Sequence, residues 1–439
     1  MTLSTEALAI GITAPFGSGS TTAAESLSQR MKMKFKHCKL SDLLVARWRR
    51  ENPRSRAKRP DLQSLGNRVR WDAKDPGALV QQALQILARK RACYKRLVFD
   101  GIRNLGEVER LRATFGQRFY LFAVECPASE RWERMRHTYE SQKKTMEDFT
   151  VESERDRDQE DPFGQQVQLC VDQADVLLLN DGTVQLRKYR EALAKYVALV
   201  TGERPRYPSP LEILMNLAYS AAHGSKCLKR QVGAVLVDAP PGEMGDIVGQ
   251  GFNENPVRTR SCAEEPKYGA DPARSIWGRC HRDLVRYESF VQLARRKCFC
   301  PNCGKPISEP SGEVPPWRCQ ECSVNLEEFF WPERAMSLCT AVHAEVSAII
   351  AAGLRCKGST LYATTFPCFQ CAEKISHVGV KNIVFTEPYP DIRAAERLQI
   401  AGIGAVRFQG VRSRRFDEIF SRARPYVSEE LRARARASG

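Results

Sequence analysis

Long apolar runs are missing from this sequence. Its apolar runs, such as Ile86 to Ala88 and Val176 to Leu179, fall far below the roughly 20 residues that a membrane-spanning helix needs. The N-terminus likewise lacks the basic segment, apolar stretch and small-residue cleavage site of a secretory signal. We therefore expect no membrane partner, and a cytoplasmic location is the simplest expectation.

Acidic residues are too few to balance the basic ones. The chain has 52 Asp and Glu against 68 Lys and Arg, which gives a net charge of +16. A basic chain attracts polyanions such as nucleic acid and nucleotides. The charge concentrates in Arg47 to Arg59 and Arg412 to Arg436, and either solvated surface or RNA binding explains these stretches. Charge alone does not separate an RNA-binding protein from one that binds triphosphates.

The order of sequence patterns predicts two α/β domains in a chain of 439 residues. Strand-like and helix-like patterns alternate in the first part, which is typical of a parallel sheet. A proline-rich stretch then breaks both periodicities and indicates a linker. The predicted parts are a first domain over 1–203, a linker over 204–210, a second domain over 211–425 with an insertion at about 262–335, and a basic tail over 426–439.

The expected strands are short apolar runs that turn signals separate. In the first domain they are Ala7 to Ile12, Arg96 to Phe99, Phe119 to Val124 and Ala174 to Leu179. In the second they are Gln231 to Val237, Ile247 to Phe252, Thr360 to Thr364 and Asn382 to Thr386. Helices are expected from Thr21 onward and over Leu211 to Ala222, His343 to Ala352 and Pro367 to Val378.

Cysteine is abundant, with 16 residues, and eleven of them lie between Cys262 and Cys371. Several form C-x-x-C pairs. In a reducing compartment, paired cysteines indicate metal binding more often than disulfides.

One histidine and two of these cysteines predict a catalytic zinc site. His343-Ala344-Glu345 is followed by Pro367-Cys368-Phe369-Gln370-Cys371. The ligands His343, Cys368 and Cys371 leave a fourth position open for water, as catalytic zinc requires. Cys368 and Cys371 share a face of the expected helix, whose positive end favours thiolates.

Glu345 is then the predicted proton carrier. It can accept a proton from water and deliver it to a ring nitrogen, and it can later protonate the departing amine. The pattern H-x-E followed by P-C-x-x-C is the signature of zinc-dependent nucleobase deaminases. The alternatives for this C-x-x-C pair are a redox pair and a structural zinc.

A second, structural zinc site is predicted in the insertion. Two C-x-x-C pairs are separated by fifteen residues, a spacing that favours a four-cysteine zinc ribbon. The expected ligands are Cys300, Cys303, Cys319 and Cys322. Cys298 could replace Cys300, and disulfides are the alternative. Cys262, Cys280 and His281 could form a further site.

The first domain opens with a loop that resembles a P-loop. It follows an expected strand and opens an expected helix, the context in which backbone N–H groups hold phosphate. The candidate nucleotide-binding residues are Gly17, Ser18, Gly19, Ser20, Thr21 and Thr22. Ser20 stands in place of the usual lysine and Ala14 in place of the first glycine, which weakens phosphoryl transfer. The alternatives are nucleotide sensing, residual kinase activity and a purely structural loop.

The stretch from Val232 to Val411 resembles the deoxycytidylate deaminases. The residues that carry the resemblance are Arg230 to Val235, Gly251 to Asn253, Cys339 to Glu345 and Pro367 to Ala372. It implies that Asn253 binds the nucleotide sugar and that Tyr389 packs near the base. It also implies that Lys229 and Arg230 lie near the phosphate.

The first domain, with its Phe99 to Asn104 and Asn180 to Gly182 segments, resembles nucleoside-monophosphate and dephospho-coenzyme-A kinases. As a whole, residues 5–425 resemble the bacterial anti-phage dCTP deaminases. This resemblance implies a P-loop kinase-like parallel-sheet domain joined to a cytidine-deaminase-like α/β/α domain with a zinc-ribbon insertion.

The same resemblance implies an activity and its control. The enzyme would convert dCTP, and often dCMP, to the uracil nucleotide and so deplete deoxycytidine nucleotides during phage replication. A small RNA or another host factor would hold it inactive. It implies a homo-oligomer, and a second nucleotide could occupy the P-loop.

Three other functions compete with this interpretation. One is a housekeeping dCMP deaminase of pyrimidine metabolism. Another is a polynucleotide cytidine editor, although no dense interleaving of aromatic and basic residues occurs near the predicted zinc site. The third is a non-enzymatic RNA- or nucleotide-responsive binding module, which the complete set of His343, Cys368, Cys371 and Glu345 argues against.

Overall fold

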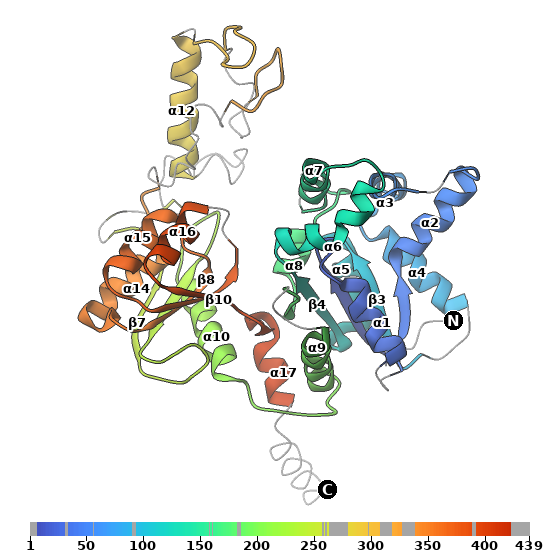
Figure 1. The fold of residues 1–439 in the computed structure, drawn as a ribbon, viewed down its shortest axis with the longest axis horizontal. Helices are drawn as coiled ribbons and strands as arrows, with labels where there is room; N and C mark the ends of the chain where they lie inside the picture. The colour runs from blue at the N-terminus through green and yellow to red at the C-terminus, as the bar shows by residue number, and fades with distance from the viewer. Residues whose placement is uncertain are drawn as a thin grey trace, which may run out of the picture. The chain divides into compact units, whose positions relative to one another are not determined.

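The computed structural model describes residues 7–422 except for 31–33, 56, 90–93, 158, 160, 182–185, 257–258, 260, 263–279, 297, 308–317, 327–338 and 389–391. The chain divides into two compact units. Unit 1 consists of Met1–Pro208 and Gln409–Gly439, and unit 2 is Ser209–Phe408. Figure 1 shows their elements. Among the described helices, none has the length and apolar character needed to cross a membrane.

Unit 1 is an α/β fold. Its strands are β1 (Leu8–Thr13), β2 (Lys36–Lys39), β3 (Arg96–Ile102), β4 (Phe119–Glu125), β5 (Val176–Leu179) and β11 (Gly410–Val411). Its α-helices are α1 (Ser20–Glu25), α2 (Leu40–Glu51), α3 (Arg59–Ala73), α4 (Ala78–Arg89), α5 (Leu105–Phe115), α6 (Ala128–Glu140), α7 (Met146–Arg157), α8 (Val167–Asp172), α9 (Leu186–Val200) and α17 (Phe416–Arg422).

The strands of unit 1 form one sheet in the order β11-β5-β4-β1-β3-β2. Every neighbouring pair is parallel except β11 and β5. All seven residues of β4 are buried, as expected for a central strand with helices on both faces of the sheet. The predicted parallel α/β fold is therefore confirmed for this unit, and the four strands expected here are all present.

The C-terminal segment differs from the predicted boundary at residue 425. Beyond Phe408 the chain returns to unit 1, where Gly410 and Val411 pair with Leu177 and Val176 of β5. Val411, Ile419 and Phe420 are buried in the same core as β1, β4 and α9. Apolar residues therefore attach this segment to the first unit, although it follows the second in sequence.

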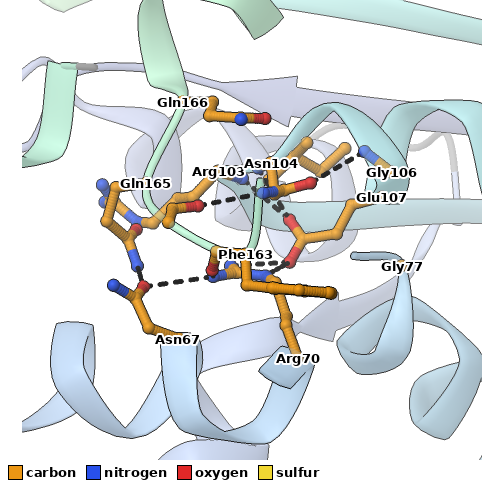
Figure 2. Close-up of polar contacts among 12 residues, drawn as sticks. Asn67, Arg70, Gly77, Arg103, Asn104, Gly106, Glu107, Phe163, Gln165 and Gln166 are labelled. Carbon is orange, nitrogen blue, oxygen red and sulfur yellow. Dashed lines mark hydrogen bonds and ion pairs between the residues drawn. The ribbon is translucent and has the colours of Figure 1, made fainter. Parts of the chain in front are cut away.

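A buried ion pair joins two helices of unit 1. The guanidinium of Arg70 on α3 lies 2.9 Å from the carboxylate of Glu107 on α5, and both side chains are almost inaccessible to solvent. Arg70 also donates to the carbonyl of Phe163, and Glu107 accepts from the backbone N–H groups of Arg103 and Asn104 (Figure 2). Each charge is therefore neutralised and hydrogen-bonded, as a buried ion pair requires.

Unit 2 is a mixed α/β fold. Its strands are β6 (Gly233–Val237), β7 (Ile247–Phe252), β8 (Thr360–Thr365), β9 (Asn382–Glu387) and β10 (Gly404–Arg407). Its α-helices are α10 (Pro210–Ala222), α12 (His281–Arg295), α14 (Ala344–Ala352), α15 (Phe369–His377) and α16 (Ile392–Ile400). The sheet has the order β10-β9-β8-β6-β7, in which β6 is antiparallel to both of its neighbours. The strands and helices expected here all form.

Helix α14 lies directly against β7 because β7 contains glycine at the contact. A Cβ atom added at Gly251 would lie 2.4 Å from the backbone nitrogen of Ala348, and one at Gly249 would lie 2.3 Å from its carbonyl oxygen. Any other residue would push the helix away from the sheet. This close packing fixes the start of α14, where His343 and Glu345 lie.

Candidate active site and metal centres

Two helix starts bring the three predicted zinc ligands together. His343 is the N-cap of α14, and Cys368 is the N-cap of α15 with Cys371 in its first turn. Nδ1 of His343 lies 3.2 Å from Sγ of Cys371 and 3.4 Å from Sγ of Cys368. The three possible ligand atoms all lie within 4.8 Å of one another. Pro367 precedes the N-cap, so the helix begins at Phe369, two residues after the expected start at Pro367.

The two cysteines have different acidities. Hydrogen bonds from Cys371 and His343 lower the pKa of Cys368 to about 4. The hydrogen bond to Cys368, together with burial, raises the pKa of Cys371. Cys368 is thus held as a thiolate in this arrangement, and thiolate is the form that binds metal. One imidazole and two thiols form a donor set that fits a zinc ion with an open fourth position.

Glu345 lies beside this cluster and is only 4 % exposed. Burial raises the pKa of its carboxyl group, although nearby His343 acts in the opposite direction. Glu345 stays outside the compact ligand group, which among the described residues consists of His343, Cys368 and Cys371 alone. A buried carboxylate beside a metal site, and outside its ligand set, is suited to carry a proton.

The four cysteines of the insertion form a second cluster. The sulfurs of Cys300 and Cys322 lie 3.7 Å apart, as do those of Cys303 and Cys319. These separations exceed a disulfide bond of about 2.05 Å, and all four thiols are free. All four sulfurs lie within 4.8 Å of one another, which fits a four-cysteine zinc site. Cys298 packs beside the cluster without belonging to it.

Comparison with known proteins gives this geometry a family context. Residues 208–387 match the family model "Cytidine and deoxycytidylate deaminase zinc-binding region", and residues 10–161 match the model "AAA domain". The first of these matches falls almost wholly within unit 2. We call unit 2 the deaminase unit and unit 1 the P-loop unit.

Similar proteins include two curated deoxycytidylate deaminases. That of Schizosaccharomyces pombe is 27% identical over 315 residues, which cover 70% of this chain and 76% of the relative. That of Enterobacteria phage T4 is 26% identical over 179 residues, or 40% and 77% of the two chains. Among solved structures, the dCMP deaminase from cyanophage S-TIM5 in complex with dCMP and dUMP covers 45% of this chain and 95% of its own, at 18% identity and a TM-score of 0.25.

Three of the four predicted substrate contacts, namely Asn253, Lys229 and Arg230, lie at one end of the deaminase sheet. Asn253 follows β7, and its side chain accepts from the N–H of Val232 at 2.7 Å and donates to the carbonyl of Arg230 at 2.9 Å. It therefore holds the loop before β6 in place. Lys229 lies in the same loop. Tyr389 is outside the described residues.

Glu387 is a residue of this region that the sequence patterns did not single out. Its carboxylate lies 2.6 Å from the guanidinium of Arg230 and 3.3 Å from the hydroxyl of Thr365. Glu387 ends β9, Thr365 ends the parallel strand β8, and Arg230 precedes β6. No local motif relates residues this far apart, so only the sheet brings them together.

The candidate P-loop lies between β1 and α1. Gly17 and Gly19 both have positive φ angles, 81° and 97°, which favour glycine. The hydroxyl of Thr21 donates to Asp100 at 2.8 Å, and the amide of Asn180 donates to the carbonyl of Ser18 at 2.7 Å. The loop borders a cavity of about 1090 Å³ that lies wholly within the P-loop unit. The cavity lining includes five of the six predicted residues, namely Gly17, Gly19, Ser20, Thr21 and Thr22, while Ser18 is buried and does not line it.

Cys262, Cys280 and His281 form no comparably tight metal cluster, judged on the described residues. The backbone N–H of His281 lies 3.5 Å from the sulfur of Cys262, and a hydrogen bond with Cys280 raises the pKa of the Cys262 thiol.

Proposed function

We propose that this protein is a zinc-dependent hydrolytic deaminase of deoxycytidine nucleotides. It converts dCTP, and also dCMP, to dUTP or dUMP and ammonia. The observation that carries the proposal is the convergence of His343, Cys368 and Cys371 beside the buried carboxylate of Glu345.

Four residues of the chain have separate roles in the proposed reaction. His343, Cys368 and Cys371 would hold the zinc, which when bound activates water as a nucleophile. Glu345 accepts a proton from that water and passes it to the ring nitrogen beside C4. A C–O bond forms at C4. Glu345 then takes the remaining proton of the new C4 hydroxyl group and gives it to the amine, so that the C–N bond breaks, ammonia leaves and the C4 carbonyl forms.

Nucleotide rather than free base is supported by the basic loop before β6. Arg230 is partly exposed, and its guanidinium forms an ion pair with Glu387 at the end of β9. An arginine suits phosphate because its planar group binds two oxygens at once. Asn253 fixes the same loop and is proposed to reach the sugar when substrate is bound.

Two roles remain to be separated by experiment. The joined P-loop unit supports nucleotide depletion in anti-phage defence, with a small RNA or another host factor as the inhibitor. The named relatives are deoxycytidylate deaminases, which supports a housekeeping role on dCMP. In both cases we propose a cytoplasmic homo-oligomer.

A nucleotide panel tests the activity. Purified protein is incubated with dCTP, dCMP, CTP and a cytosine-containing oligonucleotide, and uracil products are measured with and without other nucleotides present. Uracil from dCTP or dCMP is expected. Absence of product from every mononucleotide refutes the proposal, and product from the oligonucleotide alone assigns the chain to the polynucleotide editors.

A further inference from the structure

The candidate P-loop has no lysine to neutralise a bound phosphate. Ser20 stands at the lysine position and carries no charge. Five residues of the loop, with Gly17 and Gly19 among them, nevertheless line the cavity of about 1090 Å³ in the P-loop unit. A phosphate bound at this loop therefore needs a cation from another part of the fold.

Helix α6 brings an arginine to the loop. The guanidinium of Arg134 lies 3.4 Å from the carbonyl oxygen of Gly17 and 2.8 Å from that of Asn180, and Arg134 lines the cavity. Close packing holds the helix there, because a Cβ atom added at Gly17 would lie 3.3 Å from Cβ of Arg131. A guanidinium has five N–H donors, so two carbonyl contacts leave others for a ligand.

A second arginine reaches the same loop from the start of α3. The guanidinium of Arg59 lies 4.1 Å from the ring centre of Phe16, the residue directly before Gly17. It makes no hydrogen bond or ion pair among the described residues, and Arg59 lines the cavity. Unlike the buried, unbonded Nε of Arg131, its nitrogens keep accessible surface. Burial, reinforced by Arg103, lowers the pKa of Arg59 to about 10, so this unpaired group is still cationic at neutral pH.

The charges around the cavity do not balance. Seven Lys and Arg side chains line it, against the two carboxylates of Asp100 and Glu152. Three of the cations form ion pairs with carboxylates, and four form none within the part of the chain that the structure describes. The paired ones are Arg70, Arg103 and Lys144, and the unpaired ones are Lys39, Lys58, Arg59 and Arg134. A cavity with an excess of cations favours an anionic ligand.

We propose that Arg134 and Arg59 take the place of the missing lysine, so that the P-loop unit binds a triphosphate group between these two guanidinium groups and the loop. Phosphate oxygens accept two hydrogen bonds at once from a guanidinium and neutralise its charge. The successive charged groups of a triphosphate match an excess of several cations better than a single phosphate does. The cavity volume is also sufficient for a whole nucleoside triphosphate.

This site goes beyond the proposed deamination. Its residues belong to the P-loop unit, whereas the zinc ligands and Glu345 belong to the deaminase unit. Binding of a triphosphate requires no bond to form or break. The site can therefore act without the lysine that stabilises phosphoryl transfer.

Calorimetry on the full chain measures the binding of ATP and of inorganic triphosphate. Neither probe contains cytosine, so the result is independent of deamination. We expect both to bind. Arg134→Gln and Arg59→Gln should each weaken binding about tenfold or more, since each removes charged hydrogen bonds to phosphate. Tighter binding of ATP assigns the cavity to nucleotides, and equal binding assigns it to the phosphate chain alone.

Three further variants separate phosphate binding from a structural role. Arg136→Gln is the matched control, because Arg136 lies on the same helix, pairs with Glu133 and does not line the cavity. Arg134→Lys keeps a positive charge and should retain most of the binding. Ser20→Lys, introduced into the Arg134→Gln chain, should restore binding because it returns the lysine to its usual position.

Four results overturn the inference. They are no binding of either probe, unchanged affinity in both Arg→Gln variants, an equal loss in Arg136→Gln, and no recovery with Ser20→Lys. Urea denaturation of each variant accompanies the calorimetry, and the free energy of unfolding should stay close to that of the original chain. A triphosphate bound in the deaminase unit instead would bind equally to all of these variants.

Discussion

The two units place their functional groups in different ways. In the deaminase unit, His343 with Glu345 and Cys368 with Cys371 occur in short motifs at the starts of two helices. In the P-loop unit, the motif itself is incomplete, and the polar groups of the cavity come from several helices and loops between Phe16 and Asn180. A motif that is complete in sequence indicates chemistry directly, whereas a degenerate one leaves the function to residues that only the fold assembles.

The largest expected effect separates chemistry from binding. Glu345→Gln should lower deamination by about 10²–10⁴-fold, because the carboxylate is the proton carrier. Zinc content should not change, since Glu345 lies outside the ligand cluster. The exposed Glu373 on α15 provides the control Glu373→Gln, which should keep full activity. An active Glu345→Gln protein would mean that Glu345 is not the proton carrier. The short motif of the deaminase unit would then not indicate its chemistry directly.

Stability of the P-loop unit should depend on its buried ion pair. Glu107→Gln leaves the Arg70 guanidinium buried without its counter-charge, and we expect a loss of about 3–5 kcal/mol in the free energy of unfolding. Denaturation with urea measures it. The exposed pair Arg187–Glu191 offers the control Glu191→Gln, which should cost less than about 1 kcal/mol. An equal cost for both variants contradicts the prediction.

The zinc content of the deaminase unit should report its two clusters separately. Cys319→Ser removes one ligand of the four-cysteine cluster and should lower the bound zinc by about one ion per chain. Cys298→Ser, which changes a neighbouring cysteine outside that cluster, should leave the zinc content as it is. Elemental analysis of the purified proteins measures the zinc bound to each variant. Zinc loss in Cys298→Ser would mean that Cys298 is a ligand.

The smallest effect concerns substrate affinity. If Arg230 contacts phosphate, Arg230→Gln should raise the KM for dCMP roughly tenfold with little change in kcat. Lys357 is exposed and precedes the opposite, amino end of β8, so Lys357→Gln is the control. Steady-state kinetics on both variants provides the measurement. An unchanged KM in Arg230→Gln would mean that other residues bind the phosphate.

Much of this molecule followed from local sequence patterns. Apolar runs marked eight strands because a strand needs only a few consecutive residues of the right kind. The short strands Lys36–Lys39, Gly404–Arg407 and Gly410–Val411 were not predicted. Lys36–Lys39 is polar, and Gly410–Val411 is a strand only because β5 lies beside it.

The sequence by itself indicated the three candidate zinc ligands of the deaminase unit and the four cysteines of the insertion. The covalent chain sets the spacing within each C-x-x-C pair, since residues three apart at a helix start or in a turn are held close together whatever surrounds them. The approach of His343 to Cys368, and of Cys303 to Cys319, depends on the fold. The tertiary structure alone decided the partners of Arg230, Arg70 and Gln165, which lie 157, 37 and 98 residues away in the chain. It also decided that the segment after Phe408 belongs to unit 1. These pairings depend on which apolar faces pack together, and no spacing in the sequence encodes that choice.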